Sequence, residues 1–346
     1  MVLVLGMAAA LWGIGALMKT PLRLRLWMLA ALWAGVVLGH ITLPDGHPLR
    51  QATGGAAQGW VALGIVVALV LAYRSGLRRL RAKAQPVAAA APAGAFRPAE
   101  LDRYARHILL REIGGPGQRR MKDARVLVVG AGGLGSPALF YLAAAGVGTI
   151  GVIDEDVVEG SNLQRQIIHT DDRIGMPKVF SAEQAMKALN PFITVQCYNR
   201  RLDDAVARDL IADHDLILDG TDNFDTRYLV NRICAELGKP LIAGAITQWE
   251  GQLSLWHPSE GGPCYECVFP TRPAPGLVPT CAEAGVAAPL PGVIGSMMAM
   301  EAVKHLTGAG ETLRGRLMIH DALYAETRVI TVKRRPDCAA CGGGAS

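Results

Sequence analysis

An arginine, a lysine and a carboxylate that could act together lie in the middle of the chain, at Arg165, Lys178 and Asp222. Two cations and a carboxylate that binds Mg²⁺ suit a nucleoside triphosphate, because its phosphates are anionic and carry a magnesium ion. Taken singly, each residue has an ordinary explanation, since surface arginines are usually solvated and Asp-Asn is common in turns. Their occurrence in one series of predicted strands and helices indicates a triphosphate site.

The elements that would position these residues begin with a strand–helix–strand unit. Residues 125–130 (RVLVVG) form an apolar run typical of a buried parallel strand. GAGGLG at 130–135, a helical stretch at 136–145 and a second strand at 149–153 follow. Glycines at this spacing let the backbone approach phosphate, and a helix N-terminus offers free N–H groups to it. Asp154, 19 positions after Gly135, has the place of the carboxylate that binds ribose in dinucleotide-type folds.

On its own, this unit is compatible with NAD binding. The residues that follow argue for a triphosphate instead, because a dense polar run, 161–166 (SNLQRQ), leads to Lys178. A later predicted strand, 216–219, continues into Gly-Thr-Asp-Asn at the same edge of the sheet. An NAD-dependent oxidoreductase is therefore the alternative of another class, and the cations and the lack of a separate hydride-acceptor domain disfavour it.

Four of the seven cysteines form two CxxC pairs, at Cys264 and Cys267 and at Cys338 and Cys341. Two such pairs are typical of a closed tetrahedral zinc site, and we expect a structural Zn²⁺ there. A catalytic zinc would need an open position. A nucleotide-binding chain with paired cysteines also favours a reducing compartment over a disulfide framework.

Ordered matches along residues 96–341 resemble the ubiquitin-activating superfamily and, within it, the bacterial MoeB/ThiF/HesA branch. The matching segments are RYARHI at 103–108, GAGGLG at 130–135, DED at 154–156, SNLQRQ at 161–166, GMPK at 175–178, TDN at 221–223, EGQ at 250–252, PCYEC at 263–267, TCAEAG at 280–285 and GVIGS at 292–296. The resemblance implies an α/β, Rossmann-like nucleotide-binding fold. It has a mostly parallel sheet, C-terminal antiparallel strands and a Cys₄ zinc site.

The resemblance also implies roles for single residues. The ATP-binding residues are Gly133 in the phosphate loop, Asp154 at the ribose, Asn162, Arg165 and Lys178 at the phosphates and Asp222 at Mg²⁺, with Asp156 and Asn223 completing the set. Arg106 resembles an arginine that reaches into the neighbouring subunit's site, which implies a homodimer. Arg106, Arg165, Lys178 and Asp222 are the expected catalytic residues.

Two further positions near the predicted site, Cys281 and Gln248, need separate interpretation. Cys281 lies in a Pro/Gly-rich stretch, 271–292, that we expect to be a long loop beside the active site. Some family members use a cysteine here for sulfur or thioester chemistry and others do not, so a reactive and a bystander thiol both stay open. Gln248 departs from the family, where relatives often carry arginine, and this bears on how a carrier protein docks.

The activity implied by the resemblance is the ATP-dependent adenylation of the C-terminal glycine of a small ubiquitin-like sulfur carrier ending in Gly-Gly. The GPCYEC and PLPGVIGS runs favour the small subunit of molybdopterin synthase, in molybdenum cofactor biosynthesis, as that carrier. The alternatives are the thiamine-pathway carrier and another sulfur carrier. A membrane-anchored scaffold without activity is a further alternative, which the phosphate-contacting residues disfavour.

The first 75 residues read as a membrane region with three predicted spans, at 2–18, 24–43 and 56–73. A hydrocarbon core needs about 20 apolar residues per helix. A signal peptide is disfavoured because no basic residue precedes the first run, and a buried soluble helical hairpin stays the alternative. Residues 76–95 are the expected linker and 96–346 the expected adenylyltransferase domain.

Charge orients these spans. Lys19, Arg23 and Arg25 lie in the first loop, and five basic residues lie between 74 and 83. The positive-inside rule then places the first loop and the catalytic domain in the cytoplasm, with the chain anchored in the membrane. The net charge of +5 is concentrated in these runs, and no basic stripe with interleaved aromatics occurs, so we expect no nucleic-acid partner.

Overall fold

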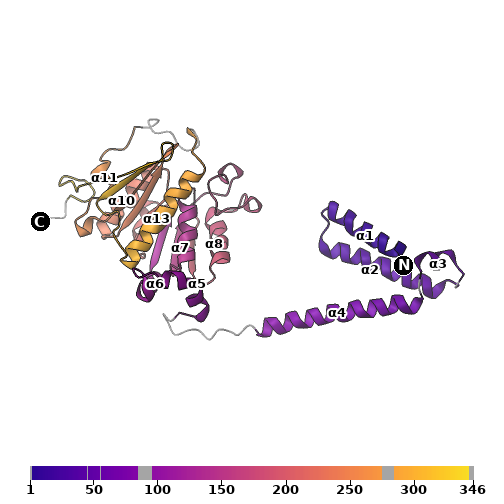
Figure 1. Ribbon diagram of the computed structural model, residues 1–346. Helices are drawn as coiled ribbons and strands as arrows, with labels where there is room; N and C mark the ends of the chain where they lie inside the picture. Colours follow the sequence, from indigo (N-terminus) through magenta and orange to yellow (C-terminus); the bar gives the residue numbers. More distant parts are fainter. Residues whose placement is uncertain (1, 45, 55, 85–95, 275–283, 343–346) are drawn as a thin grey trace. The chain divides into compact units, whose positions relative to one another are not determined.

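The computed structural model describes the chain apart from residues 1, 45, 55, 85–95, 275–283 and 343–346 (Figure 1). The chain divides into two compact units, residues 1–90 and 91–346, and each is described by itself. The expected boundaries of the membrane region, linker and catalytic domain stay predictions, because much of the expected linker lies outside the described residues.

Within the described part of the second unit, eight strands form one sheet in the order β3-β2-β1-β4-β5-β6-β7-β8. The pairs from β3 to β5 are parallel, and the pairs from β5 to β8 are antiparallel. The expected α/β fold is thus confirmed, with its parallel sheet and C-terminal antiparallel strands. The strands are β1 (Arg125–Val129), β2 (Thr149–Ile153), β3 (Thr194–Tyr198), β4 (Leu216–Asp219), β5 (Leu241–Ile246), β6 (Glu250–Trp256), β7 (Arg316–Asp321) and β8 (Glu326–Thr331).

The sequence of β1 shows why helices cover both faces of this sheet. Val126 and Val128 pack into the core on one face, while Leu127 and Val129 pack into the core on the other. Side chains of a strand alternate between faces, so an apolar residue at every position needs a cover on each side. On the first face lie α7 (Gly135–Ala145), α8 (Lys178–Leu189) and α13 (Pro289–Thr307), and on the second lie α9 (Asp204–Ala212) and α10 (Phe224–Leu237).

The chain order creates a crevice at one edge of the layers. After β1 the chain builds β2 and β3 on one side, and it then crosses to β4 on the other side of β1. Connections from β1 and β4 therefore leave in opposite directions, which opens a crevice at the carboxyl ends of these two strands. The remaining described elements of this unit are α5 (Pro98–Ile108), α6 (Gly114–Asp123), α11 (Tyr265–Val268) and the 3₁₀ turns η1 (Gly160–Asn162), η2 (Asp171–Arg173) and η3 (Pro258–Glu260).

The structure corrects one expectation about the C-terminal half. The stretch 271–292 was expected to be one long loop, but α13 begins at Pro289. Proline is favoured in the first turn of a helix, where its missing N–H has no intrahelical partner in any case. The Pro-Leu-Pro-Gly run therefore begins a helix, and Leu290 and Ile294 of its first turns are buried in the core.

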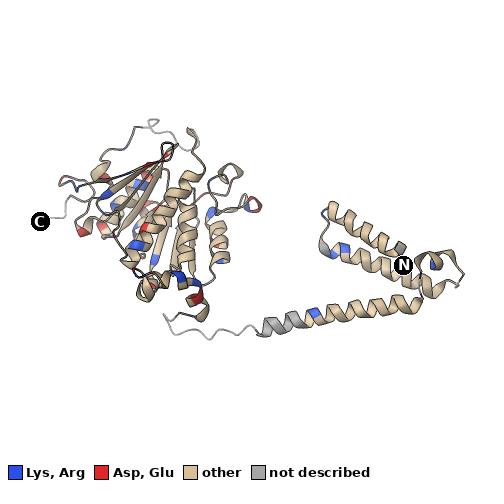
Figure 2. Ribbon diagram, viewed as in Figure 1, with Lys and Arg blue, Asp and Glu red and all other residues tan. Residues whose placement is uncertain are grey.

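The first unit consists of α1 (Val2–Leu17), α2 (Leu22–Thr42), the short α3 (Pro48–Thr53) and α4 (Ala57–Ala84). Two described helical segments, Arg23–Thr42 and Ala57–Gly76, are long and apolar enough to cross a membrane. The first predicted span coincides with α1, whose 16 residues reach only about 24 Å. Figure 2 shows few charged residues on these helices. Val4, Val36 and Trp60 form a small core between them, and Trp33 donates to the carbonyl of Trp60.

Candidate active site

A cavity of about 1260 Å³ lies at the carboxyl ends of β1, β2 and β4, where the strand order reverses. The expected ATP-binding residues that line it are Gly133, Asp154, Asp156, Arg165, Lys178, Asp222 and Asn223. Asn162 is not in its lining but contacts a residue that is. Residues predicted from scattered motifs are thus brought together in one cavity large enough for a nucleotide.

The glycine loop closes tightly between β1 and α7. Gly130 has a φ of +92°, and a Cβ on Gly135 would lie 1.9 Å from the carbonyl oxygen of Gly130. No side chain fits there, so the loop turns directly into the first turn of α7. Gly132, Gly133 and Leu134, which lead into α7, line the cavity. The first amides of a helix mostly lack intrahelical acceptors, so this end of α7 suits an anion, although the amide of Ser136 already donates to the carbonyl of Gly132.

Asp154 ties the end of β2 to the glycine loop. Its Oδ2 accepts a hydrogen bond from the amide of Ala131 at 2.7 Å, and its Oδ1 accepts one from the amide of Asp156 at 2.9 Å. Burial raises the pKa of the Asp154 carboxyl above its usual value, and the nearby Lys178 ammonium and both amides oppose that rise. The carboxylate is therefore fixed in direction by two backbone amides.

The two cations predicted from the sequence, Lys178 and Arg165, are held by neighbouring side chains. Further cations of the cavity lining are Arg200, Arg201, Arg227 and Arg272. The Lys178 ammonium lies 2.8 Å from Oδ2 of Asp156, and the lysine side chain is 6% exposed while the aspartate is 61% exposed. Arg165 donates to Oδ1 of Asn162 at 2.9 Å, and Asn162 donates to Glu159 at 3.2 Å. Positioned charges need little reorganisation when an anion binds, which strengthens their attraction for it.

The loop after β4 carries the remaining expected residues. Asp222 is exposed, and among the described residues it has no hydrogen-bond or ion-pair partner, so its carboxylate is available to a cation. Asn223 lines the cavity, but its side-chain oxygen accepts from the amide of Thr226 at 2.8 Å and caps α10. Asn223 therefore has a structural use beside any contact with the nucleotide.

Two buried side chains that the sequence analysis did not identify, Asp219 and Arg227, hold this loop through Thr221. Asp219, the last residue of β4, is fully buried, and its Oδ1 accepts from both the amide and the hydroxyl of Thr221. Arg227 of α10 donates to the carbonyl of Thr221 at 2.7 Å and lies 3.9 Å from the other oxygen of Asp219. An arginine on an amphipathic helix is normally expected to be solvated, so no sequence pattern predicted that Arg227 is buried.

His169 supports the glycine loop from a third side. It is buried, its Nε2 lies 3.0 Å from the carbonyl oxygen of Ala131, and its Nδ1 lies 2.9 Å from the hydroxyl of Ser181. Burial lowers the pKa of this imidazole, which outweighs the hydrogen bond to Ala131. The neutral ring then donates to the carbonyl and accepts from the serine. The sequence did not predict this role, because His169 has no second residue at the spacing of a metal ligand or catalytic partner.

The structure does not bring every expected catalytic residue to the cavity. Arg106 is exposed on α5 and is absent from the described lining, so a role in catalysis would need a second copy of the chain. Cys281 lies outside the described residues. Gln248 lines the cavity and donates to the carbonyl of Ala284 at 3.1 Å.

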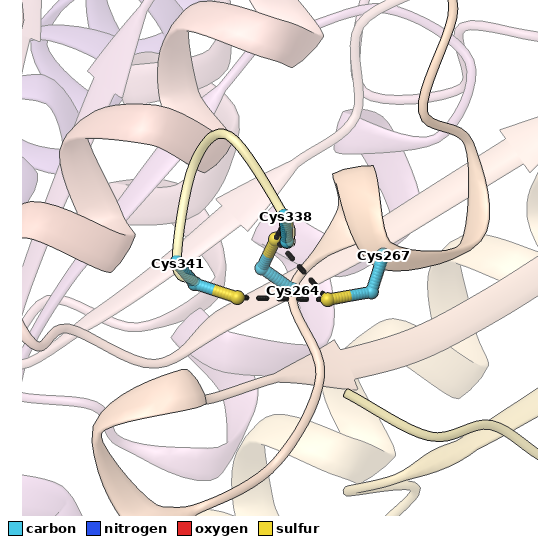
Figure 3. A group of neighbouring side chains, drawn as sticks. All are labelled: Cys264, Cys267, Cys338 and Cys341. Atoms are coloured by element: carbon cyan, nitrogen blue, oxygen red, sulfur yellow. Dashed lines mark hydrogen bonds between the residues drawn. The ribbon is translucent and has the colours of Figure 1, made fainter. Parts of the chain in front are cut away.

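The four paired cysteines lie together, as Figure 3 shows, between α11 and the C-terminal segment. Cys264 is 3.5 Å from Cys338 and 3.9 Å from Cys267, and Cys267 is 3.5 Å from Cys341, all between sulfur atoms. Tetrahedral zinc with sulfur ligands at about 2.3 Å has edges of about 3.8 Å, whereas a disulfide would need about 2.05 Å. The amide of Arg335 also donates to the sulfur of Cys267. The cluster thus fits a closed metal site.

A sheet with a glycine loop, a carboxylate fixed at the end of β2 and cations held by neighbouring side chains at its switch point is typical of a nucleotide-binding enzyme of the Rossmann type. Residues 104–340 match the model of the ThiF family. The chain belongs to the ThiF family and is an adenylyltransferase that uses ATP. This sets aside the NAD-dependent oxidoreductase.

Similar proteins cover about 70% of the chain. A "Sulfur carrier protein adenylyltransferase" of Thermus thermophilus is 51% identical over 70% of this chain and 91% of its own length. A "SAMP-activating enzyme E1" of Haloferax volcanii is 48% identical over 71% of this chain and 90% of its own length. A crystal structure of E. coli MccB has a TM-score of 0.61 at 23% identity, covering 70% of this chain and 75% of that one, which supports the fold alone.

Proposed function

We propose that the protein adenylates the C-terminal glycine of a small ubiquitin-like sulfur carrier ending in Gly-Gly, and that this carrier is the small subunit of molybdopterin synthase. The observation that carries the proposal is that Arg165, Lys178 and Asp222 line one cavity together with the glycine loop. The chain is 51% identical to a protein named a sulfur carrier protein adenylyltransferase, which supports a sulfur carrier as the substrate. The pathway rests on the sequence runs GPCYEC and PLPGVIGS.

In the proposed reaction an oxygen of the carrier's terminal carboxylate attacks the α-phosphorus of ATP. The bond from that phosphorus to the bridging oxygen of pyrophosphate breaks, and pyrophosphate leaves with its Mg²⁺ ion. An α-carboxyl titrates near about 3.5, so the nucleophile is ionised at neutral pH and needs no general base. The barrier comes from bringing one anion onto another, and fixed cations lower it by charge neutralisation and in-line positioning.

Each of the nucleotide-binding residues expected from the sequence has a role in this proposal. The glycine loop around Gly133 and the first turn of α7 bind phosphate, and Asp154 accepts from the ribose hydroxyls. Asn162, Arg165 and Lys178 neutralise the phosphates, with Asp156 holding the lysine in place. Asp222 holds Mg²⁺, and Asn223 fixes the loop on which Asp222 lies. Arg106 enters from the second subunit of a homodimer.

The cysteine cluster is proposed to bind one structural Zn²⁺ through Cys264, Cys267, Cys338 and Cys341. Four sulfur ligands leave no open position, so the ion would join the C-terminal segment to α11 without taking part in the reaction. Cys281 is proposed to be dispensable for adenylate formation, since the attacking group is the carrier's own carboxylate.

The first unit is proposed to anchor the protein in a membrane with the catalytic unit in the cytoplasm. Large apolar side chains of α2 and α4 point outward, among them Leu38, Ile41, Val66 and Leu69. Lipid accommodates such surfaces, whereas water does not. Lys19 precedes α2, whereas Arg23 and Arg25 lie in its first turn rather than in the expected loop. With α2 and α4 both crossing, this basic end of α2 and the end of α4 share one side, which the positive-inside rule makes cytoplasmic.

Exchange of labelled pyrophosphate into ATP tests the proposal, measured with the full-length protein in detergent. The molybdopterin-synthase small subunit should support exchange, and the same carrier without its last two glycines should not. Exchange only with the thiamine-pathway carrier would move the protein to that pathway. Exchange of equal size without any carrier would overturn the proposed substrate.

A further inference from the structure

The guanidinium of Arg227 lies beneath the loop that carries Asp222. It donates to the carbonyl of Thr221 at 2.7 Å and to the carbonyl of Gly244, in β5, at 2.9 Å. Its side chain is 6% exposed and forms part of the cavity floor. One buried cation thus fixes the peptide directly before Asp222 to the next strand of the sheet.

A carboxylate balances this cation without bonding to it directly. Oδ2 of Asp219 lies 3.9 Å from Nε of Arg227 and, among the described residues, has no hydrogen-bond partner. Its other oxygen already holds Thr221 from the opposite side. Removing the positive charge would leave the buried carboxylate of Asp219 uncompensated, which strongly destabilises a fold. The position therefore requires a cation, and one whose side chain is long enough to bring a single nitrogen, Nη2, to both carbonyl oxygens.

An aromatic ring connects Arg227 to the cysteine cluster. The guanidinium carbon lies 5.7 Å from the ring centre of Tyr265, within cation–π range. Tyr265 is buried between Cys264 and Cys267, and its amide donates to Oδ1 of Asn231 at 2.8 Å. The backbone that supplies two of the sulfur ligands thus also sets the ring against which Arg227 rests.

We propose that Arg227 is a positioning residue for Mg²⁺ binding, and that Tyr265 transmits the rigidity of the cysteine cluster to it. The inference rests on the proposed function, because it assigns Arg227 to the placement of the Mg²⁺-holding carboxylate of Asp222. Partners that orient a metal ligand without touching the metal commonly change metal affinity by about 10–100-fold when they are replaced. Arg227 acts on Asp222 in this way through the Thr221 carbonyl.

The test compares variants of the full-length protein for binding of Mn²⁺ with ATP, measured by electron paramagnetic resonance, and for the Mg²⁺ concentration that half-saturates pyrophosphate exchange. Arg227→Lys keeps the charge, but its shorter side chain does not bring the ammonium to the place of Nη2, and we expect its metal affinity to fall by about 10–100-fold with unchanged zinc content. Tyr265→Leu should produce a similar shift, and Tyr265→Phe, which keeps the ring, should restore the wild-type value.

Arg232→Lys is the matched control, since Arg232 lies further along α10 and makes exposed ion pairs with Asp204 and Glu236. It should bind metal as the wild type does. A folded Arg227→Lys protein with wild-type Mn²⁺ affinity, or one that loses only thermal stability, would overturn the inference. Manganese binding needs no carrier, so absence of exchange in the wild type would refute the proposed function while this measurement still decides the role of Arg227.

Discussion

Two aspartates three positions apart, Asp219 and Asp222, have opposite surroundings. Asp219 is fully buried at the end of β4, whereas Asp222 is exposed at the rim of the cavity. The sequence predicted Asp222, because acidic residues after a parallel strand have a recognisable place. It did not predict the roles of Asp219, Arg227 or His169, because their contacts join segments far apart in the chain. No local pattern encodes such contacts.

The exposed position of Asp222 separates its role in chemistry from any role in folding. We expect Asp222→Ala to lower the rate of carrier adenylation by about 10²–10³-fold, the range for loss of one electrostatic stabiliser. Its melting temperature should stay that of the wild type. Asp209→Ala, a change to an exposed residue of α9, is the control and should keep full activity. Retention of most activity in Asp222→Ala would mean that another group holds the metal.

His169 should make the stability of the fold depend on pH. Burial lowers the pKa of this side chain below its usual value of 6.5, as it does for His214, His257 and His305. Below about pH 6.5 the unfolded chain therefore binds more protons than the folded one, and the free energy of unfolding falls as the pH decreases. Melting temperatures between pH 7.5 and 5.5 should decline, with a shallower slope in His169→Gln. Equal slopes in the two proteins would contradict the lowered pKa of His169.

At the scale of elements, alternating and continuous apolar runs predicted the strands well. The expected strands at 149–153 and 216–219 coincide with β2 and β4, and the helix expected at 136–145 begins one residue earlier as α7. The loop expected at 271–292 was predicted to be too long, since α13 begins at Pro289. Proline disfavours the interior of a helix but is favoured in its first turn. The glycine loop and the CxxC pairs were recognisable because each is a local arrangement with one physical purpose.

The four-residue helix α11 is too short to be stable alone, and the cysteine cluster should hold it in place. We expect one Zn²⁺ per chain, and Cys338→Ser should lose it because one ligand is gone. The melting temperature should fall by roughly 5–10 °C, the shift that about 2–3 kcal/mol produces in a domain of this size. Metal analysis and calorimetry measure both effects.

Cys281→Ala is the contrasting control for this prediction. It should keep its zinc, its stability and its rate of adenylate formation. Loss of zinc from Cys281→Ala rather than from Cys338→Ser would show that the four ligands are wrongly assigned.

At the scale of the whole molecule, the chain joins a catalytic unit of the ThiF family to a strongly apolar helical unit. The similar proteins align with about 70% of this chain, and the matched family segment begins at residue 104. Roles in the catalytic unit could be inferred from resemblance, but the purpose of the first unit had to be inferred from hydrophobicity and charge. The apolar composition of the first unit predicts a lipid environment, but it does not indicate why the enzyme would be anchored there.

The membrane assignment predicts a difference between two lengths of chain. The full-length protein should sediment with membranes and resist extraction by alkaline carbonate, because α2 and α4 bury their apolar surfaces in lipid. A chain beginning at Phe96 should be soluble without detergent and adenylate its carrier at the full-length rate. Full-length protein recovered in the soluble fraction without detergent would refute the spans.

The length of α4 has a consequence for an anchored enzyme. Its 28 residues extend about 42 Å, while the apolar part, Ala57–Gly76, extends about 30 Å and matches the hydrocarbon thickness of a bilayer. The last eight residues continue the helix for about 12 Å beyond that layer. In an anchored enzyme this end of the helix would act as a spacer that carries the chain through the lipid headgroups as a rigid rod. In a thicker bilayer less of the rod would protrude, so membrane thickness would set the height at which the chain enters the cytoplasm.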